Sequence, residues 1–206
     1  MARDLESIVK RSRREGYALH PKAHKALVKR STPPGQSADG GRRRNKPSQY
    51  ALQLREKQKV KRLYGLLEKQ FSKLMSDATR SRGQSGTTLL AFLERRLDNA
   101  VYRSGFAVSR RAARQLVTHG HFMLNGRRVD IPSIRVVVGD EIVLREHGKS
   151  TEYFKHIDEL SPAPAAVPAW LKVDRKKFQV SVTGLPTRDD AEPDIKEQLI
   201  VEYYSR

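Results

Sequence analysis

The sequence predicts an α+β fold in which a mostly helical N-terminal domain precedes a small module of two short helices packed on an antiparallel sheet. Three observations lead to this prediction. Apolar residues recur at helical spacing over most of residues 49–101. The apolar period then changes from 3.6 to 2 after residue 121. Finally, Asn125-Gly126 separates two alternating segments, which is the strongest short-range signal for a β-hairpin.

Two helices are expected in the first half of the chain. The first begins with Ser48 as its N-cap and runs to about Met75, because one apolar stripe follows its whole length: Val60, Leu63, Tyr64, Leu67, Phe71 and Leu74. A Gly/Ser-rich break at residues 81–86 ends it. The second helix begins near Thr87 and stops near Gly105, with a stripe of Leu89, Leu90, Leu93, Leu97 and Val101.

A short third helix is expected from Ser109, as N-cap, to Gly120, where it ends. A helical wheel separates its side chains into two groups. The apolar group contains Ala112, Ala113, Leu116 and Val117, and the polar group contains Arg110, Arg111, Arg114 and Gln115. The sequence therefore predicts a helix that is buried on one face and cationic on the other.

Several strands should follow. Residues 122–124 and 128–129 form the hairpin around Asn125-Gly126, and residues 134–138 and 141–144 form a second pair around Gly139-Asp140. The three prolines of residues 161–168 predict a stiff connector. Beyond it, Trp170 and Leu171 should dock the chain again, and residues 178–182 alternate like one more strand. The apolar last residues, 198–206, are expected to pack back on the body of the protein.

These elements suggest four parts, with boundaries after residues 46, 94 and 157. Residues 1–46 form a basic extended segment, 47–94 a helical domain, 95–157 the small module, and 158–206 the connector, strand and C-terminal segment. The first part has few large apolar side chains and several prolines and glycines. The little apolar surface that this part can bury could not offset its loss of conformational entropy, roughly 1–2 kcal/mol per residue for the backbone. A partner is therefore expected to order it.

The charge points to a polyanionic partner. The 206 residues carry a formal net charge of +18, and residues 1–62 alone hold 18 Lys and Arg against 5 Asp and Glu. The densest cationic run is Arg42, Arg43, Arg44 and Lys46. A second set lies on the first long helix, with Glu56 as the one acid among its residues: Arg55, Lys57, Lys59, Lys61 and Arg62. Both sets fit phosphate contacts, although a solvated loop and a solvated helix face remain the alternatives.

Other classes of protein find little support. The chain has no cysteine, so disulfides and thiolate metal sites are excluded. His119 and His121 lack the spacing of a zinc motif, and neither a P-loop nor a catalytic constellation occurs. We therefore expect no enzyme, no catalytic residue, no metal and no cofactor. No apolar run could span a membrane, and the N-terminus has no apolar signal core, so the expected location is the cytoplasm.

Residues 92–146 contain four motifs: RRLDN at 95–99, SRRAARQLV at 109–117, HGHF at 119–122 and NGRRV at 125–129. In these motifs the stretch resembles the RNA-binding module named after small-subunit ribosomal protein four. Pseudouridine synthases and tyrosyl-tRNA synthetases carry similar modules. The flanks, however, resemble the bacterial ribosomal protein four family itself, in PPGQ at 33–36, QLREKQKVKRLYG at 53–65, LEKQF at 67–71 and EQLIVEYYSR at 197–206. A pseudouridine synthase would need a catalytic domain, and only 61 residues follow Arg145.

This resemblance implies a structural constituent of the small ribosomal subunit that binds a helical junction in the 5′ domain of 16S-type rRNA. It also implies a role in nucleating assembly, ribosomal proteins five and three as neighbours, and a place near the channel through which mRNA enters, with an influence on accuracy. Some family members also repress their own mRNA. By motif position, the module's expected rRNA contacts are Arg96, Arg103, Ser109, Arg110, Arg111, Arg114, Gln115, His119, Gly120, His121, Asn125, Arg127 and Arg128.

One feature departs from the pattern of many family members. These carry four N-terminal cysteines that hold zinc, whereas Val9 and Ser12 stand here where the first pair would fall. The chain therefore resembles the zinc-free branch, in which rRNA would have to order the N-terminal segment.

Overall fold

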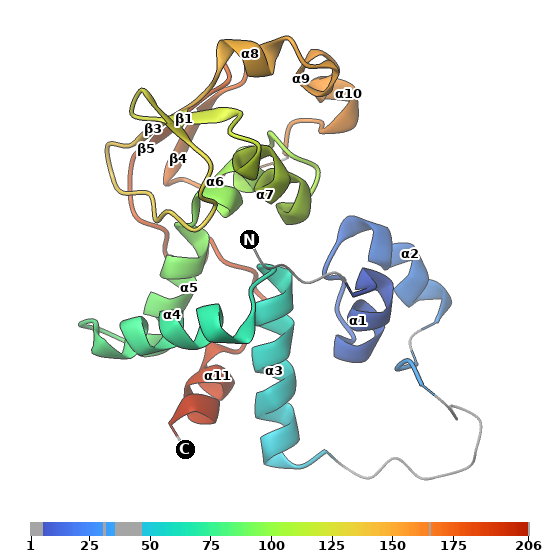
Figure 1. Cartoon of the computed structure of the whole chain (residues 1–206). Helices are drawn as coiled ribbons and strands as arrows, with labels where there is room; N and C mark the ends of the chain where they lie inside the picture. The colour runs from blue at the N-terminus through green and yellow to red at the C-terminus, as the bar shows by residue number, and fades with distance from the viewer. Residues whose placement is uncertain (1–5, 31, 36–46, 165, 206) are drawn as a thin grey trace. The chain divides into compact units, whose positions relative to one another are not determined.

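The computed structural model describes residues 6–30, 32–35, 47–164 and 166–205, and confirms the predicted α+β class (Figure 1). The chain divides into two compact units. Unit 1 comprises residues 1–86 and 194–206, and unit 2 comprises residues 87–193. The C-terminal segment thus belongs to the same unit as the N-terminal helices. In the part of the chain that the structure describes, no helix combines the length and the apolar character needed to cross a bilayer.

Unit 1 is built from helices. Its described helices are α1 (Ile8–Glu15), α2 (Pro21–Lys29), α3 (Gln49–Leu63), α4 (Glu68–Arg80) and α11 (Glu197–Tyr204). The expected return of the C-terminal residues is confirmed, since α11 packs along α3. Tyr50 stacks on Tyr203 with ring centroids 5.9 Å apart, and the Gln53 side-chain amide donates to Glu202 at 2.9 Å.

The N-terminal segment is not simply extended, because residues 8–15 and 21–29 are helical. Small side chains make this possible. Ser12 and Ala23 are fully buried, and the Ser12 hydroxyl accepts a hydrogen bond from the Leu19 amide at 3.3 Å. His20 caps α2 ahead of Pro21 at its first turn. Counting only large apolar residues therefore underestimated what this segment can bury.

The two long predicted helices are each interrupted. Gly65 adopts φ 65° between α3 and α4, so the first helix ends although its apolar stripe continues in register. The second is divided into α5 (Ser85–Glu94), which runs from unit 1 into unit 2, and α6 (Leu97–Arg103). At this break Arg96 is extended and forms an isolated β-bridge with Arg135.

Unit 2 contains, after α6, the helices and strands α7 (Arg110–Thr118), β1 (Phe122–Leu124), β2 (Arg127–Val129), β3 (Glu141–Leu144), α8 (Glu146–Lys149), α9 (Glu152–Lys155), α10 (Ile157–Leu160), β4 (Leu171–Asp174) and β5 (Gln179–Val182). The described strands form one antiparallel sheet in the order β2-β1-β3-β5-β4. The hairpin is confirmed, because Asn125 and Gly126 both have positive φ, 50° and 77°.

The predicted strand at residues 134–138 is wrong. β3 already pairs with β1 on one edge and with β5 on the other, which leaves it no free edge. The segment instead lies along the α5–α6 break, where the Val136 amide donates to the Arg95 carbonyl at 2.8 Å. The sheet also extends beyond residue 157, the expected end of the module, by recruiting β4 and β5. Trp170 and Leu171 are buried as expected.

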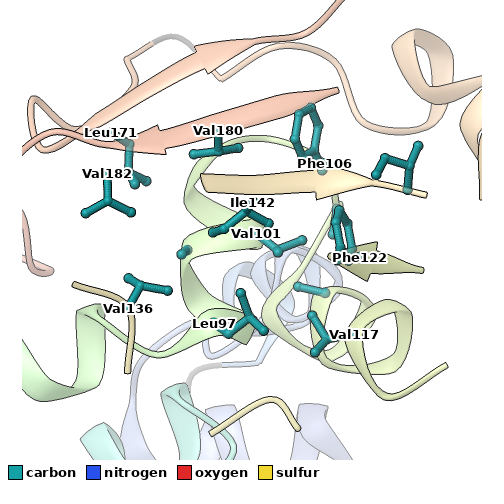
Figure 2. Packing of buried hydrophobic residues seen from close by; sticks show 14 of the residues in the cluster. Leu97, Val101, Phe106, Val117, Phe122, Val136, Ile142, Leu171, Val180 and Val182 are labelled. Atoms are coloured by element: carbon teal, nitrogen blue, oxygen red, sulfur yellow. The ribbon is translucent and has the colours of Figure 1, made fainter. Parts of the chain in front are cut away.

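The core of unit 2 lies between the sheet and the helices α6 and α7 (Figure 2). Leu97 and Val101 of α6 and Val117 of α7 point toward Phe122 and Ile142 of the sheet, and all five are fully buried. Burial of such side chains contributes about 1.5–3 kcal/mol each. This packing fixes α7 so that its other face points outward.

Candidate RNA interface

Helix α7 presents part of its predicted cationic face to solvent. Ser109 is buried and its hydroxyl accepts a hydrogen bond from the Ala112 amide at 3.2 Å, so it caps the helix. Arg111 and Gln115 are exposed and Arg114 is half-buried, whereas Ala113 and Val117 face the core. Partial burial lowers the pKa of Arg111 from its ordinary value.

Arg110 does not belong to this outward face, contrary to the helical wheel. Its guanidinium donates to Asn99 at 2.8 Å and to Glu192 at 3.0 Å, and it lies 4.7 Å from the centroid of the Tyr102 ring. The wheel could not reveal this, because the acidic partner lies 82 residues further along the chain. Arg110 is therefore a structural residue of unit 2.

Arg96 and Arg103, two further expected contacts, are also committed inside unit 2. Arg96 is buried and forms a two-point ion pair with Asp98 at 3.0 and 2.7 Å. Arg103 forms a similar pair with the fully buried Glu94 at 3.0 and 2.9 Å. Because these guanidinium groups are ion-paired with carboxylates, their charge stabilises the fold of unit 2.

The turn after α7 gathers cationic groups around a glycine. Gly120 has φ 70°, and a Cβ at this position would lie 2.7 Å from the Arg128 Nε. On its other side, Arg145 donates to the Gly120 carbonyl at 3.1 Å. We call the set His119, Gly120, His121, Arg128, Arg145 and His147 the Gly120 cluster. Glycine favours this backbone conformation, and a side chain here would require the Arg128 guanidinium to shift.

The hairpin contributes exposed arginines from the edge of the sheet. Arg127 and Arg128 lie on β2, which ends the strand order and pairs with β1 alone among the described strands. Asn125, in contrast, is occupied by the turn. Its amide donates to Asp140 at 2.7 Å, and its side-chain oxygen accepts from the Glu141 amide at 2.8 Å. Asn125 thus positions the hairpin that carries the two arginines.

The expected contacts of α3 are largely ion-paired within unit 1. Arg55 and Arg62 both bind the Glu15 carboxylate, and Lys59 binds Glu56 at 2.8 Å. Lys57 is buried. The scarcity of acids near these residues in sequence was misleading, because Glu15 comes from α1.

Lys57 contacts side chains from two other helices of unit 1, α4 and α11. Its ammonium lies 2.7 Å from Glu68 and 4.4 Å from the centroid of the Tyr203 ring. It is therefore one of the groups that attach α11 to α3. The remaining expected contacts of the N-terminal region, Arg42, Arg43, Arg44 and Lys46, lie outside the described residues.

The polar and cationic groups of α7, of the hairpin and of the turn after α7 make up a candidate interface, which we call the module surface: Arg111, Arg114, Gln115, Arg127 and the Gly120 cluster. Sequence reasoning missed Arg145 and His147. The end of the predicted strand at residue 144 placed them close to the hairpin, and that signal could have found them. Planar, charged donors on an exposed face suit phosphate groups.

Fold and surface together are those of an RNA-binding protein with an S4 domain. The family model described as the S4 domain matches residues 95–142, and the model described as the ribosomal protein S4/S9 N-terminal domain matches residues 3–94. Small ribosomal subunit protein uS4A of Symbiobacterium thermophilum is 49% identical over 213 residues, with all of both chains covered. The uS4 proteins of Roseiflexus castenholzii and Clostridioides difficile are 48% and 49% identical, also over their full lengths.

The chain belongs to the family of small ribosomal subunit protein uS4. The predictions of a ribosomal protein, of RNA binding and of a non-enzymatic role are confirmed by this membership.

Proposed function

We propose that this chain binds a helical junction in the 5′ domain of small-subunit rRNA, and that the module surface makes the principal contacts of unit 2. The supporting observation is the division of the arginines. Arg96, Arg103 and Arg110 are held by carboxylates inside unit 2, whereas Arg111, Arg127 and Arg128 are exposed. Carboxylates of unit 2 thus neutralise the first three arginines, and the other three remain accessible to solvent.

Recognition by such a surface depends on the shape and backbone of the RNA. Side chains cannot enter the narrow major groove of A-form RNA, so phosphates and 2′-hydroxyls are the accessible groups. Arginines bind phosphates through two parallel hydrogen bonds, which fixes orientation as well as adding affinity. A rigid helix and a hairpin that carry these donors would favour one arrangement of RNA strands over a generic polyanion.

The first prediction concerns three arginines of the module surface that lie outside the Gly120 cluster. Replacing Arg111, Arg114 and Arg127 together by Ala should weaken binding to the 5′ domain about tenfold or more, which corresponds to roughly 1.4 kcal/mol. The melting temperature should stay near that of the wild type. Filter binding at fixed salt, with tRNA and double-stranded RNA as competitors, measures the effect.

The control removes the same charge from elsewhere in unit 2. Lys155, Lys172 and Lys176 are exposed and lie outside the module surface, so their triple Ala variant should bind within about twofold of the wild type. Equal losses in both triple variants would show that net charge alone drives binding. Wild-type affinity in the arginine variant would eliminate the module surface.

We extend the proposal to the other roles that the family resemblance implies. The chain would act early in small-subunit assembly, with ribosomal proteins five and three as neighbours, near the channel through which mRNA enters, and would contribute to accuracy. Repression of its own mRNA would use the same surface on a similar RNA fold. Arg42, Arg43, Arg44 and Lys46 would supply a second set of phosphate contacts, and the cytoplasm is the expected location.

A further inference from the structure

The Gly120 cluster combines two arginines with three histidines. His119 and His121 flank Gly120, with ring centroids 6.1 Å apart, and the Arg145 amide donates to the His121 carbonyl at 2.9 Å. His147 follows Arg145 by two residues, at the start of α8. Histidine is the side chain whose ordinary pKa allows its charge to change between pH 5 and 8. The cluster therefore combines arginines, whose charge is permanent, with side chains of a type that can gain or lose a proton.

The charged groups around this turn come from four elements. Arg128 comes from β2, Arg145 follows β3, and His147 lies on α8. Arg114 lies on α7, five residues before His119. On the remaining side Phe154 of α9 packs against His121, with ring centroids 6.1 Å apart. Glu146 is the acid of α8, and its carboxylate is held by Lys149 at 2.6 Å.

This environment disfavours protonation of His121 when no anion is bound. Partial burial lowers the pKa of His121, and the neighbouring His119, His147 and Arg145 lower it further by repulsion. A phosphate placed among these groups would reverse the effect, because an adjacent negative charge stabilises the imidazolium form. Across the described residues, no three His, Asp or Glu side chains are arranged to hold a metal ion. An anion suits the site because two guanidinium groups, those of Arg128 and Arg145, lie against Gly120.

We propose that the Gly120 cluster is a proton-linked phosphate site, at which docking of an RNA backbone phosphate is accompanied by uptake of protons by His119, His121 and His147. The inference rests on the proposed function, since the ligand is a phosphate of the bound RNA. Arg128 and Arg145 supply charge at every pH, and the histidines supply additional charge when they are protonated. The affinity for RNA therefore increases as the pH falls through the histidine range.

The test measures affinity for the 5′-domain RNA between pH 6 and 8 at constant ionic strength. For the wild-type chain the affinity should rise about tenfold from pH 8 to pH 6, since each proton taken up contributes to the slope of log K against pH. The variant H119Q/H121Q/H147Q should change less than twofold over this range. Both proteins are measured with the same RNA, so protonation of the RNA itself contributes equally to both slopes of log K against pH.

The triple variant could be destabilised, because His121 packs on Phe154. Two further variants therefore keep His121. The variant H119Q/H147Q changes only exposed residues and should lose most of the pH dependence. In H119R/H147R the charge is fixed, so its affinity at pH 8 should approach that of the wild type at pH 6. His156, whose side chain is 61% exposed beside Glu159, gives the matched control H156Q, which should keep the wild-type slope.

Histidine NMR titrations provide a second measurement. In the free chain the pKa of His121 should lie below its ordinary value, and bound RNA should raise the pKa of all three histidines. Tight binding with identical pH slopes in the wild type and H119Q/H147Q would overturn the proton-linked site and leave the proposed function intact. Absence of selective binding by the wild type at any pH would overturn both.

Discussion

Arg110 and Arg111 are neighbours in the sequence, yet one is committed to Glu192 and the other is exposed. A rotation of about 100° per residue on α7 separates the two roles. The inner partner, Glu192, lies far along the chain, so no local pattern could assign it. Sequence therefore predicted that α7 has a cationic face, and tertiary structure decided which arginines belong to it. The same holds for Arg96 and Arg103, whose motif positions suggested contacts with RNA.

The different roles of these two arginines lead to opposite expectations for their variants. R110A should lower the free energy of unfolding by about 2 kcal/mol, because it leaves Glu192 and the buried Glu94 with less compensation. R111A should leave stability within about 0.5 kcal/mol of the wild type while weakening RNA binding. Urea denaturation of both variants tests this. Equal stabilities would contradict the inward role of Arg110.

The helices and the hairpin were predictable where the local signals agreed. Ser109, the apolar face of α7 and Gly120 fixed that helix at both ends, and Asn125-Gly126 fixed the hairpin. The breaks were not predictable. The stripe of α3 continues into α4 in register, so periodicity could not reveal that Gly65 ends the helix. Likewise residues 134–138 alternate like a strand, but the edges of β3 were taken by β1 and by the sequence-distant β5.

At the scale of elements, Glu68 of α4 links α3 to α11. Burial alone would favour its neutral form, but hydrogen bonds from Lys57, Lys61 and Tyr204 outweigh this and lower its pKa to about 2. The Tyr204 hydroxyl donates to the carboxylate at 2.8 Å, and burial together with this carboxylate raises the pKa of Tyr204. One partly exposed carboxylate thus serves three donors from two helices.

Because the pKa of Glu68 is lower in the folded state than its ordinary 4.5, its stabilisation is fully present above pH 4.5 and disappears as the pH falls toward 2. E68Q should be less stable than the wild type by about 1 kcal/mol near pH 7, a value reduced for solvent screening. The difference should vanish near pH 2. Urea denaturation at several pH values measures it, and a difference that is independent of pH would contradict the ionic role of Glu68.

At the scale of the molecule, the formal charge of +18 overstates the positive charge that is available to bind RNA. Arg55, Lys57, Lys59 and Arg62 carry much of the excess in α3, and all four have carboxylate partners in unit 1. The overall charge correctly indicated a polyanionic partner. It could not locate the interface, because the acids that neutralise the basic set of α3 come from α1 and α4 as well as from α3 itself.

The salt dependence of binding should differ between variants of the ion-paired arginines of α3 and variants of the module surface. Log K should fall linearly with log salt by about 0.7–0.9 per phosphate contact. Changing Arg111, Arg114 and Arg127 to Ala should therefore reduce the slope by about 2, whereas changing Arg55 and Arg62 to Gln should leave it nearly unchanged. Titrations at four or more salt concentrations give the slopes. An equal reduction in the two variants would mean that the ion-paired arginines of α3 and the arginines of the module surface contribute alike.

The packing of α11 on α3 also sets an order of events during synthesis. Residues 87–193 form a continuous stretch, and all of them are translated before the residues of α11. Every residue of unit 2 has therefore been joined to the chain before α3 can receive the aromatic side chains of Tyr203 and Tyr204. Chains usually fold domain by domain from the N-terminus. Here the unit whose translation begins first is the last to be complete, because the residues that pack on Tyr50 and Lys57 are translated after all of unit 2.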